Sequence, residues 1–329
     1  MTPDGNQEDH SPHLSRKKMV VQVIGFLIGI ALLYVCIRTA WTKSGDWSAI
    51  READSNTIIA LIGFGLLSTI IDGFVFWGVL CPYKRLKPLQ VQNVNMTAAM
   101  LNYAPIRLGT LFRITYHARV DNVKLLAIVG WFAAIVVTTL ACMTAVTTAA
   151  LVTGGSMIPF SLLTALRILV FGGVIWLSAR LEFVKKICKG KEKMLGDPKA
   201  LFVGLFGRLL VLASNTVRMG FAAEILGIEL GIQNLVILSV AALMLSFNPL
   251  GRVGWREWTL MMITPYLAGS AFEGTTVDVE GLAAQLALVE SAGEFLAIVP
   301  FGILTAAWAL PRLLNGRAKG LTSAHASGD

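Results

Sequence analysis

Arginines gather around two proline and glycine breaks in an otherwise apolar sequence. The stretch NYAPIRLGTLFR covers residues 102–113, and FNPLGRVGWREW covers residues 247–258. Arginine presents a planar fork of N–H donors that matches the oxygens of a phosphate group. Breaks at proline and glycine free backbone N–H groups, and the N-terminus of a short helix adds partial positive charge. Together these features indicate a phosphate-binding site.

The two stretches share an order of residue types. In each, an asparagine and a proline precede an Arg-x-Gly sequence and a further arginine. The candidate substrate-binding residues are Asn102, Pro105, Arg107, Gly109, Arg113, Asn248, Pro249, Arg252, Gly254, Arg256 and Glu257. Glu257 either balances an arginine of the site or begins an outgoing helix at the interface. We expect His117 and Arg119, which follow the first stretch, to contact lipid headgroups.

Four ionisable residues inside long apolar runs are expected to support this site: Asp72, Arg218, Glu290 and Glu294. Ionisable groups at membrane depth are usually functional, and structural pairing is the main alternative. Glu290 and Glu294 are four residues apart, so they share one helix face. They would neutralise the arginines of an empty cavity or relay protons. Arg208 lies nearer a membrane interface, and we expect it to extend its charged end towards water.

Composition places these residues in a membrane protein. Of 329 residues, 55% are hydrophobic and only 15% are charged, and the mean hydropathy is +0.68. Apolar runs of 18 or more residues are long enough to cross a bilayer core of about 30 Å as helices. The sequence therefore predicts an all-α, polytopic fold. We expect about six long transmembrane helices, at 20–42, 57–80, 124–152, 157–180, 200–224 and 283–310.

Residues 90–121 and 234–270 do not fit single spans. Each has two apolar arms that are too short to cross the membrane, joined by one of the proline and glycine breaks. Non-helical backbone at membrane depth is tolerated where it is buried in protein or lines a wet cavity. We therefore predict two re-entrant or broken-helix hairpins. Because one enters from each side, they would form an inverted repeat that meets at a substrate site.

Basic residues in the loops predict the orientation. Sixteen Lys and Arg residues lie in the tails and loops of one side, against two on the other. The positive-inside rule then places both termini in the cytoplasm of a multi-pass cell (inner) membrane protein. We expect 1–19 to be a disordered cytoplasmic tail, 20–310 to be the transmembrane domain and 311–329 to be a cytoplasmic tail. The formal net charge of +8 follows from this orientation, so no nucleic-acid partner is expected.

The other residues that could bind a metal or catalyse a reaction do not form a recognisable motif. The four cysteines and four histidines are dispersed, without metal-ligand spacing. The sequence also lacks a nucleotide-binding glycine loop and a nucleophile with an evident histidine partner. We expect neither metal nor other cofactor, and we do not expect an enzyme.

The two arginine stretches resemble the transmembrane region, or flippase domain, of the lysylphosphatidylglycerol synthase family. The similarity rests on residues 102–113 and 247–258, and the span order extends it over most of 15–315. Arg252 stands where that family commonly has a second glycine, which puts the glycine turn in doubt. The resemblance implies a membrane domain that moves phospholipids or related lipid carriers between leaflets. Because the chain ends at Asp329, we expect it to lack the aminoacyl-transferase domain of the synthase.

Two functional readings therefore remain open from the sequence. The first is a lipid translocase that takes an anionic phospholipid or a polyprenyl-phosphate into an arginine-lined cavity. The second is a membrane-embedded transferase acting on such a lipid, or a protein that presents the lipid to a partner enzyme. The sequence predicts no oligomeric state.

Single cysteines at Thr275 and Ser323 test the orientation in intact cells with an impermeant maleimide, in a background free of native cysteines. We expect Thr275→Cys to be labelled, because the 271–282 loop is predicted to face outside. Ser323→Cys should be protected in the cytoplasm. Labelling at 323 without labelling at 275 would contradict the orientation and, with it, the inverted repeat.

Overall fold

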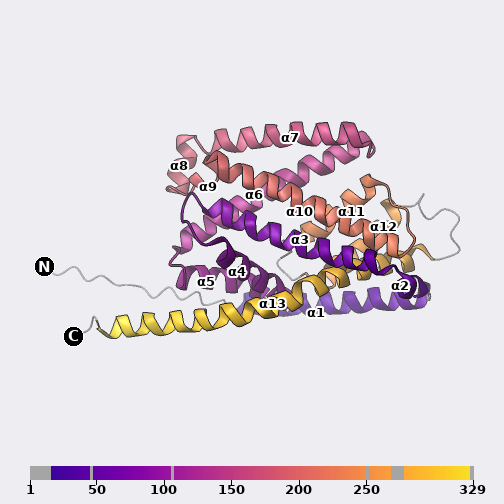
Figure 1. Ribbon diagram of the computed structural model, residues 1–329, viewed down its shortest axis with the longest axis horizontal. Coiled ribbons are helices and arrows are strands. Elements are labelled where there is room, and N and C mark those ends of the chain that lie inside the picture. The colour runs from indigo at the N-terminus through magenta and orange to yellow at the C-terminus, as the bar shows by residue number, and fades with distance from the viewer. Residues whose placement is uncertain are drawn as a thin grey trace.

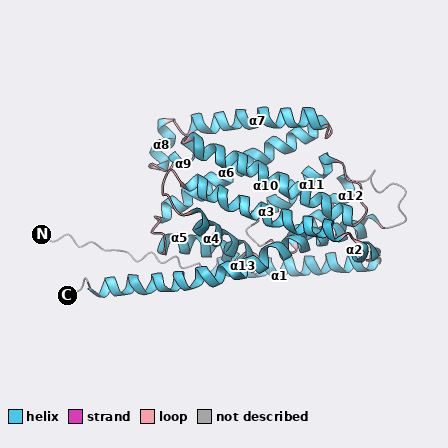
Figure 2. Ribbon diagram, in the orientation of Figure 1, coloured by secondary structure: helices cyan, strands magenta, loops and turns pink. Residues whose placement is uncertain are grey.

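The computed structural model describes residues 16–44, 47–104, 107–245, 247–248, 252–267 and 278–326, with side chains between 20 and 315. Within these ranges the protein is built of helices and contains no strand (Figure 2). Six helices are long and apolar enough to cross a membrane. These observations confirm the predicted all-α, multi-pass fold.

The long helices are α1 (Arg16–Thr39), α3 (Ser55–Leu80), α6 (Leu125–Thr153), α7 (Met157–Ser178), α10 (Pro198–Ile225) and α13 (Val279–Ala326). A π-helical turn, η1 (Ala40–Ser44), extends α1. In Figure 1, α3 and α10 lie side by side within the bundle, whereas α7 runs along its edge. Only Gly172 of α7 is buried, so most of that helix is available to lipid.

Local sequence signals begin and end these helices. The side chain of Asp54 accepts a hydrogen bond from the backbone N–H of Asn56 at the start of α3, at 3.2 Å. Asp197 does the same for α10, where Pro198 occupies the first helical position. Helix α6 ends at Gly154, whose φ of 59° is the left-handed conformation that glycine adopts readily.

Four shorter helices form the two predicted hairpins. Helices α4 (Pro88–Leu101) and α5 (Leu108–Arg119) pack together, as do α11 (Ile232–Leu245) and α12 (Trp255–Leu267). A 14-residue helix is only about 21 Å long, which is less than the thickness of the bilayer core. The structure thus contains two pairs of short helices where the sequence predicts them. The inverted repeat stays a prediction.

The ends of the bundle match the distribution of loop charge. In Figure 1 the start of α1 and the end of α13 lie at the same end as α8 (Glu182–Cys188) and α9 (Lys193–Gly196). Helix α2 (Ser48–Glu52) lies at the opposite end. The basic tails and loops therefore share one side, although which side is cytoplasmic stays a prediction.

Two glycines of the predicted binding set allow close backbone packing, Gly109 within the first hairpin and Gly254 against α1. A Cβ atom on Gly109 would lie 1.9 Å from the carbonyl oxygen of Ala98, so α5 can approach α4 only with glycine there. Gly254 has a φ of 81°, and a Cβ atom would lie 1.6 Å from the carbonyl oxygen of Gly29. Next to it, the Trp255 indole N–H donates to the carbonyl oxygen of Gly25 at 3.1 Å. Helix α1 thus holds the entry to α12 in place.

Gly109→Ala tests the packing of the first hairpin. We expect a loss of about 1–3 kcal/mol in stability, because the added methyl group overlaps backbone that cannot move aside. The measurement is thermal unfolding of the protein in detergent. Gly63→Ala in α3 is the control, since nothing lies within 4 Å of its Cβ position; it should be neutral or slightly stabilising. Equal midpoints for the two variants would contradict close α4–α5 packing.

Candidate functional site

A cavity of about 310 Å³ lies inside the bundle, between both hairpins and helices α3, α6, α10 and α13. This volume is at the lower end of the range of about 300–1,000 Å³ typical of ligand pockets. Six arginines line it: Arg107, Arg113, Arg208, Arg218, Arg252 and Arg256. Three carboxylates also line it: Asp72, Glu290 and Glu294. The described lining therefore carries an excess of three positive charges.

One group of these charges centres on two glutamates of α13. The Arg218 Nε donates to Glu290 Oε1 at 3.0 Å, and its Nη2 lies 2.9 Å from Glu294 Oε2. Arg256 pairs with both glutamates, and Arg252 pairs with Glu294. Glu290 is 1% exposed and Glu294 is 6% exposed. We call these five residues the α13 cluster; it joins α10, α12 and α13.

A second group surrounds Asp72 and Phe76 of α3. Arg208 Nη1 lies 2.5 Å from Asp72 Oδ1. Arg113 donates to the Asn95 amide oxygen at 2.5 Å, and its Cζ lies 3.9 Å from the centroid of the Phe76 ring. None of the described carboxylates forms an ion pair with Arg113. We call these five residues the α3 cluster.

Arg107 links the two hairpins. It precedes α5 with a φ of 48°, the left-handed region that a residue with a side chain rarely adopts. From there its Nε donates to the backbone carbonyl oxygen of Asn248 at 3.0 Å. The ends of the two hairpins therefore meet at the cavity, although Pro105 and Pro249 themselves lie outside the described residues.

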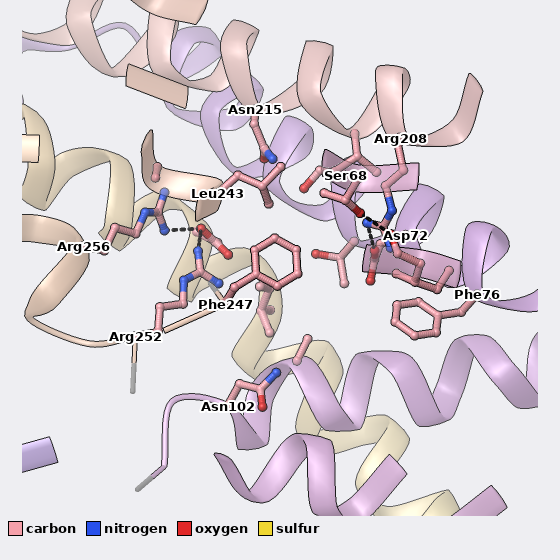
Figure 3. A pocket seen from close by; sticks show the side chains of 18 of the residues that line it. Ser68, Asp72, Phe76, Asn102, Arg208, Asn215, Leu243, Phe247, Arg252 and Arg256 are labelled. Atoms are coloured by element: carbon pink, nitrogen blue, oxygen red, sulfur yellow. Dashed lines mark hydrogen bonds and ion pairs between the residues drawn. The ribbon is translucent and has the colours of Figure 1, made fainter. Parts of the chain in front are cut away.

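The two clusters face each other across the cavity. Figure 3 shows Arg252 and Arg256 on one side and Asp72 and Arg208 on the other, with the Phe247 ring between them. The cavity is thus charged at two ends and partly apolar in between.

Nine of the predicted residues line this cavity. They are Asn102, Arg107, Arg113, Arg252 and Arg256 of the binding set, and Asp72, Arg218, Glu290 and Glu294 of the supporting set. The i,i+4 spacing of the two glutamates does place both inside the cavity. Asn248 contributes its backbone carbonyl to the hairpin contact.

The structure gives Glu257 a structural role rather than contact with an arginine of the cavity. Its carboxylate accepts the backbone N–H of Gly254 at 2.6 Å and the Ser291 hydroxyl at 2.5 Å. The first contact caps the N-terminus of α12, and the second ties α12 to α13. The sequence allowed two interpretations, a glutamate that balances an arginine or one that begins a helix. These contacts fit the second better.

Two expectations for other charged residues are wrong. Arg208 does not extend to an interface; it is 6% exposed, lines the cavity and pairs with Asp72. His117 does not meet headgroups, because it is fully buried and its Nδ1 lies 2.6 Å from Asp121 Oδ2. Arg119 is exposed, as expected. The sequence did contain an indication of the buried position of Arg208. Asp72 lies in the middle of a predicted span, and a carboxylate there requires a cation at the same depth.

Comparisons of the chain with protein-family models, curated proteins and solved structures find no match. The resemblance to the flippase domain of the lysylphosphatidylglycerol synthase family stays a prediction. Function must therefore be argued from the cavity.

Glu294→Gln tests the α13 cluster. Removing this charge leaves three arginines with one carboxylate, and breaking a buried pair in this way costs about 3–5 kcal/mol. We expect a lower unfolding temperature in detergent that added phosphate partly restores, because the anion replaces the lost charge.

Glu280→Gln is the matched control. It lies at the start of the same helix, where an exposed glutamate pairs with Lys43, so we expect little change and no response to phosphate. Similar behaviour of the two variants would contradict a neutralising role for Glu294.

Proposed function

We propose that this protein is a lipid translocase that admits an anionic lipid headgroup into the arginine-lined cavity. The observation that carries the proposal is the excess of arginine over carboxylate inside a bundle of membrane-spanning helices. An arginine at membrane depth costs about 2.5–3.5 kcal/mol on insertion scales, so the one excess arginine of the α13 cluster and the one of the α3 cluster would together cost roughly 5–7 kcal/mol. A bound anion would offset that cost.

The size of the cavity supports a headgroup as the group that enters. A volume of about 310 Å³ suits a phosphate and its immediate substituent. It is small for a whole phospholipid, so the acyl or prenyl chains would stay in the bilayer. A phospholipid or a polyprenyl-phosphate meets this description equally well.

The α13 cluster suggests how the empty protein is stabilised. Glu290 and Glu294 hold the arginines when no ligand is present. A phosphate offers the arginines two or more further acceptor oxygens. Binding would therefore supply the negative charge that three arginines sharing two glutamates still lack.

Movement of the lipid would require the hairpins to separate. The Arg107–Asn248 contact joins them on one side of the site. In the mechanism we propose, opening this contact and rocking one hairpin against the other exposes the cavity to each side in turn. The excess of basic loops on one side favours a cell (inner) membrane with both termini in the cytoplasm.

Reconstitution into vesicles tests the proposal directly. We expect the protein to exchange a fluorescent phosphatidylglycerol between leaflets, detected by a quencher that reaches only the outer leaflet. A transferase would change the lipid species, and a lipid-presenting partner would do neither by itself. No exchange above protein-free vesicles, for this lipid or a polyprenyl-phosphate, would contradict a translocase.

Arg113→Lys and Arg256→Lys test whether the headgroup is recognised by geometry. Lysine keeps the charge but loses the bidentate fork, so we expect exchange to fall by about tenfold or more. Arg119→Lys on the exposed part of α5 is the control and should keep full activity. Free replacement by lysine at both cavity positions would contradict a geometric grip on phosphate.

A further inference from the structure

Each end of the cavity has an excess of positive charge of its own. The α13 cluster contains three arginines and two glutamates. The α3 cluster contains two arginines and one aspartate. The counter-charge that the two clusters lack is therefore divided between two places rather than concentrated in one.

Both clusters also contain buried N–H groups without a hydrogen-bond partner in the described part of the chain. In the α13 cluster these are Arg218 Nη1 and Arg256 Nε, and in the α3 cluster they are Arg113 Nε and Arg208 Nε. All four side chains are at least nine-tenths buried, with 2–8% of their surface exposed. Buried donors are normally satisfied, so each cluster is short of an acceptor as well as of negative charge.

One anionic group cannot meet both requirements. The Phe247 ring lies between the clusters in Figure 3, and Leu243 also lines this region. A phosphate bound at the α13 cluster would leave Arg113 with an amide oxygen and two aromatic faces, of Phe76 and Phe132, but no negative charge of the ligand. A phosphate bound at the α3 cluster would leave the third arginine of the α13 cluster without counter-charge.

The geometry points to a lipid whose headgroup carries two anionic groups joined by a short spacer, with one group bound at each cluster. This inference rests on the proposed translocase function and names the class of headgroup that the site selects. Arg113 has a particular part in it, since its contacts with Phe76 and Asn95 hold its guanidinium group in place. Arg113 would therefore favour a headgroup that carries a second anionic group.

Native mass spectrometry of the purified protein in neutral detergent can count bound lipids. Three probes share one diacylglycerol: phosphatidylglycerol, phosphatidylglycerol phosphate and phosphatidic acid. We expect phosphatidylglycerol phosphate to bind about tenfold more tightly than the other two, which is the effect of one further charge-assisted contact. Phosphatidic acid controls for the phosphomonoester itself, because it carries that group without a second anionic group.

Variants at the two clusters test the division of the site. Arg113→Gln at the α3 cluster and Arg252→Gln at the α13 cluster should each reduce the preference for phosphatidylglycerol phosphate to about one, because either change leaves a single anion site. Arg252 is the most exposed arginine of its cluster, so its loss disturbs folding least. Arg119→Gln, at an exposed position of α5, should keep the preference.

The outcomes separate this inference from the proposed function. Equal binding of phosphatidylglycerol phosphate and phosphatidic acid, or a preference unchanged in both cluster variants, would overturn two-point recognition while leaving a lipid site intact. Glycerol 1,3-bisphosphate that binds as tightly as the lipid would overturn the assignment to a lipid. If none of the three lipids binds, the proposed function itself fails.

Discussion

The structure depends on a buried group of opposite charges that joins three helices. Arg218 of α10 and Arg256 of α12 meet Glu290 and Glu294 of α13 where the hairpins approach the long helices. None of these charges could face lipid without a large loss of free energy, so their mutual pairing constrains how the helices assemble. A buried pair need not stabilise the fold more than apolar packing would. Its effect here is to keep arginine side chains at membrane depth in defined positions.

That constraint leads to the cavity. Three arginines share two glutamates, and across the cavity Asp72 pairs with Arg208 while Arg113 has no paired carboxylate among the described residues. Close backbone contact at Gly109, and between Gly29 and Gly254, lets the short helices come near enough for these side chains to meet. The Arg107–Asn248 contact then joins the hairpin ends. A membrane protein that buries more arginine than carboxylate in this way is suited to an anionic ligand, since the ligand completes the counter-charge.

The sequence by itself determined the class of fold and much of the site. Long apolar runs predict six spanning helices, and short arms around a break predict the two hairpins, because hydrophobic length must match bilayer thickness. The i,i+4 spacing of Glu290 and Glu294 predicts that both face one way. Arginines beside the breaks were identified for a similar reason, since a charge at membrane depth needs a polar partner.

Only the tertiary structure decided which partner each charge has. Arg208 appeared to lie near an interface, yet its position beside Asp72 depends on how α10 packs against α3. Glu257 is next to Arg256 in the chain, but successive helical residues point in different directions, and its carboxylate caps α12 instead. The division of the cavity into two charged ends follows from side chains of six helices and of Arg252, which precedes α12. Such contacts between distant residues leave no periodic pattern in the sequence, so they are visible only once the helices are packed.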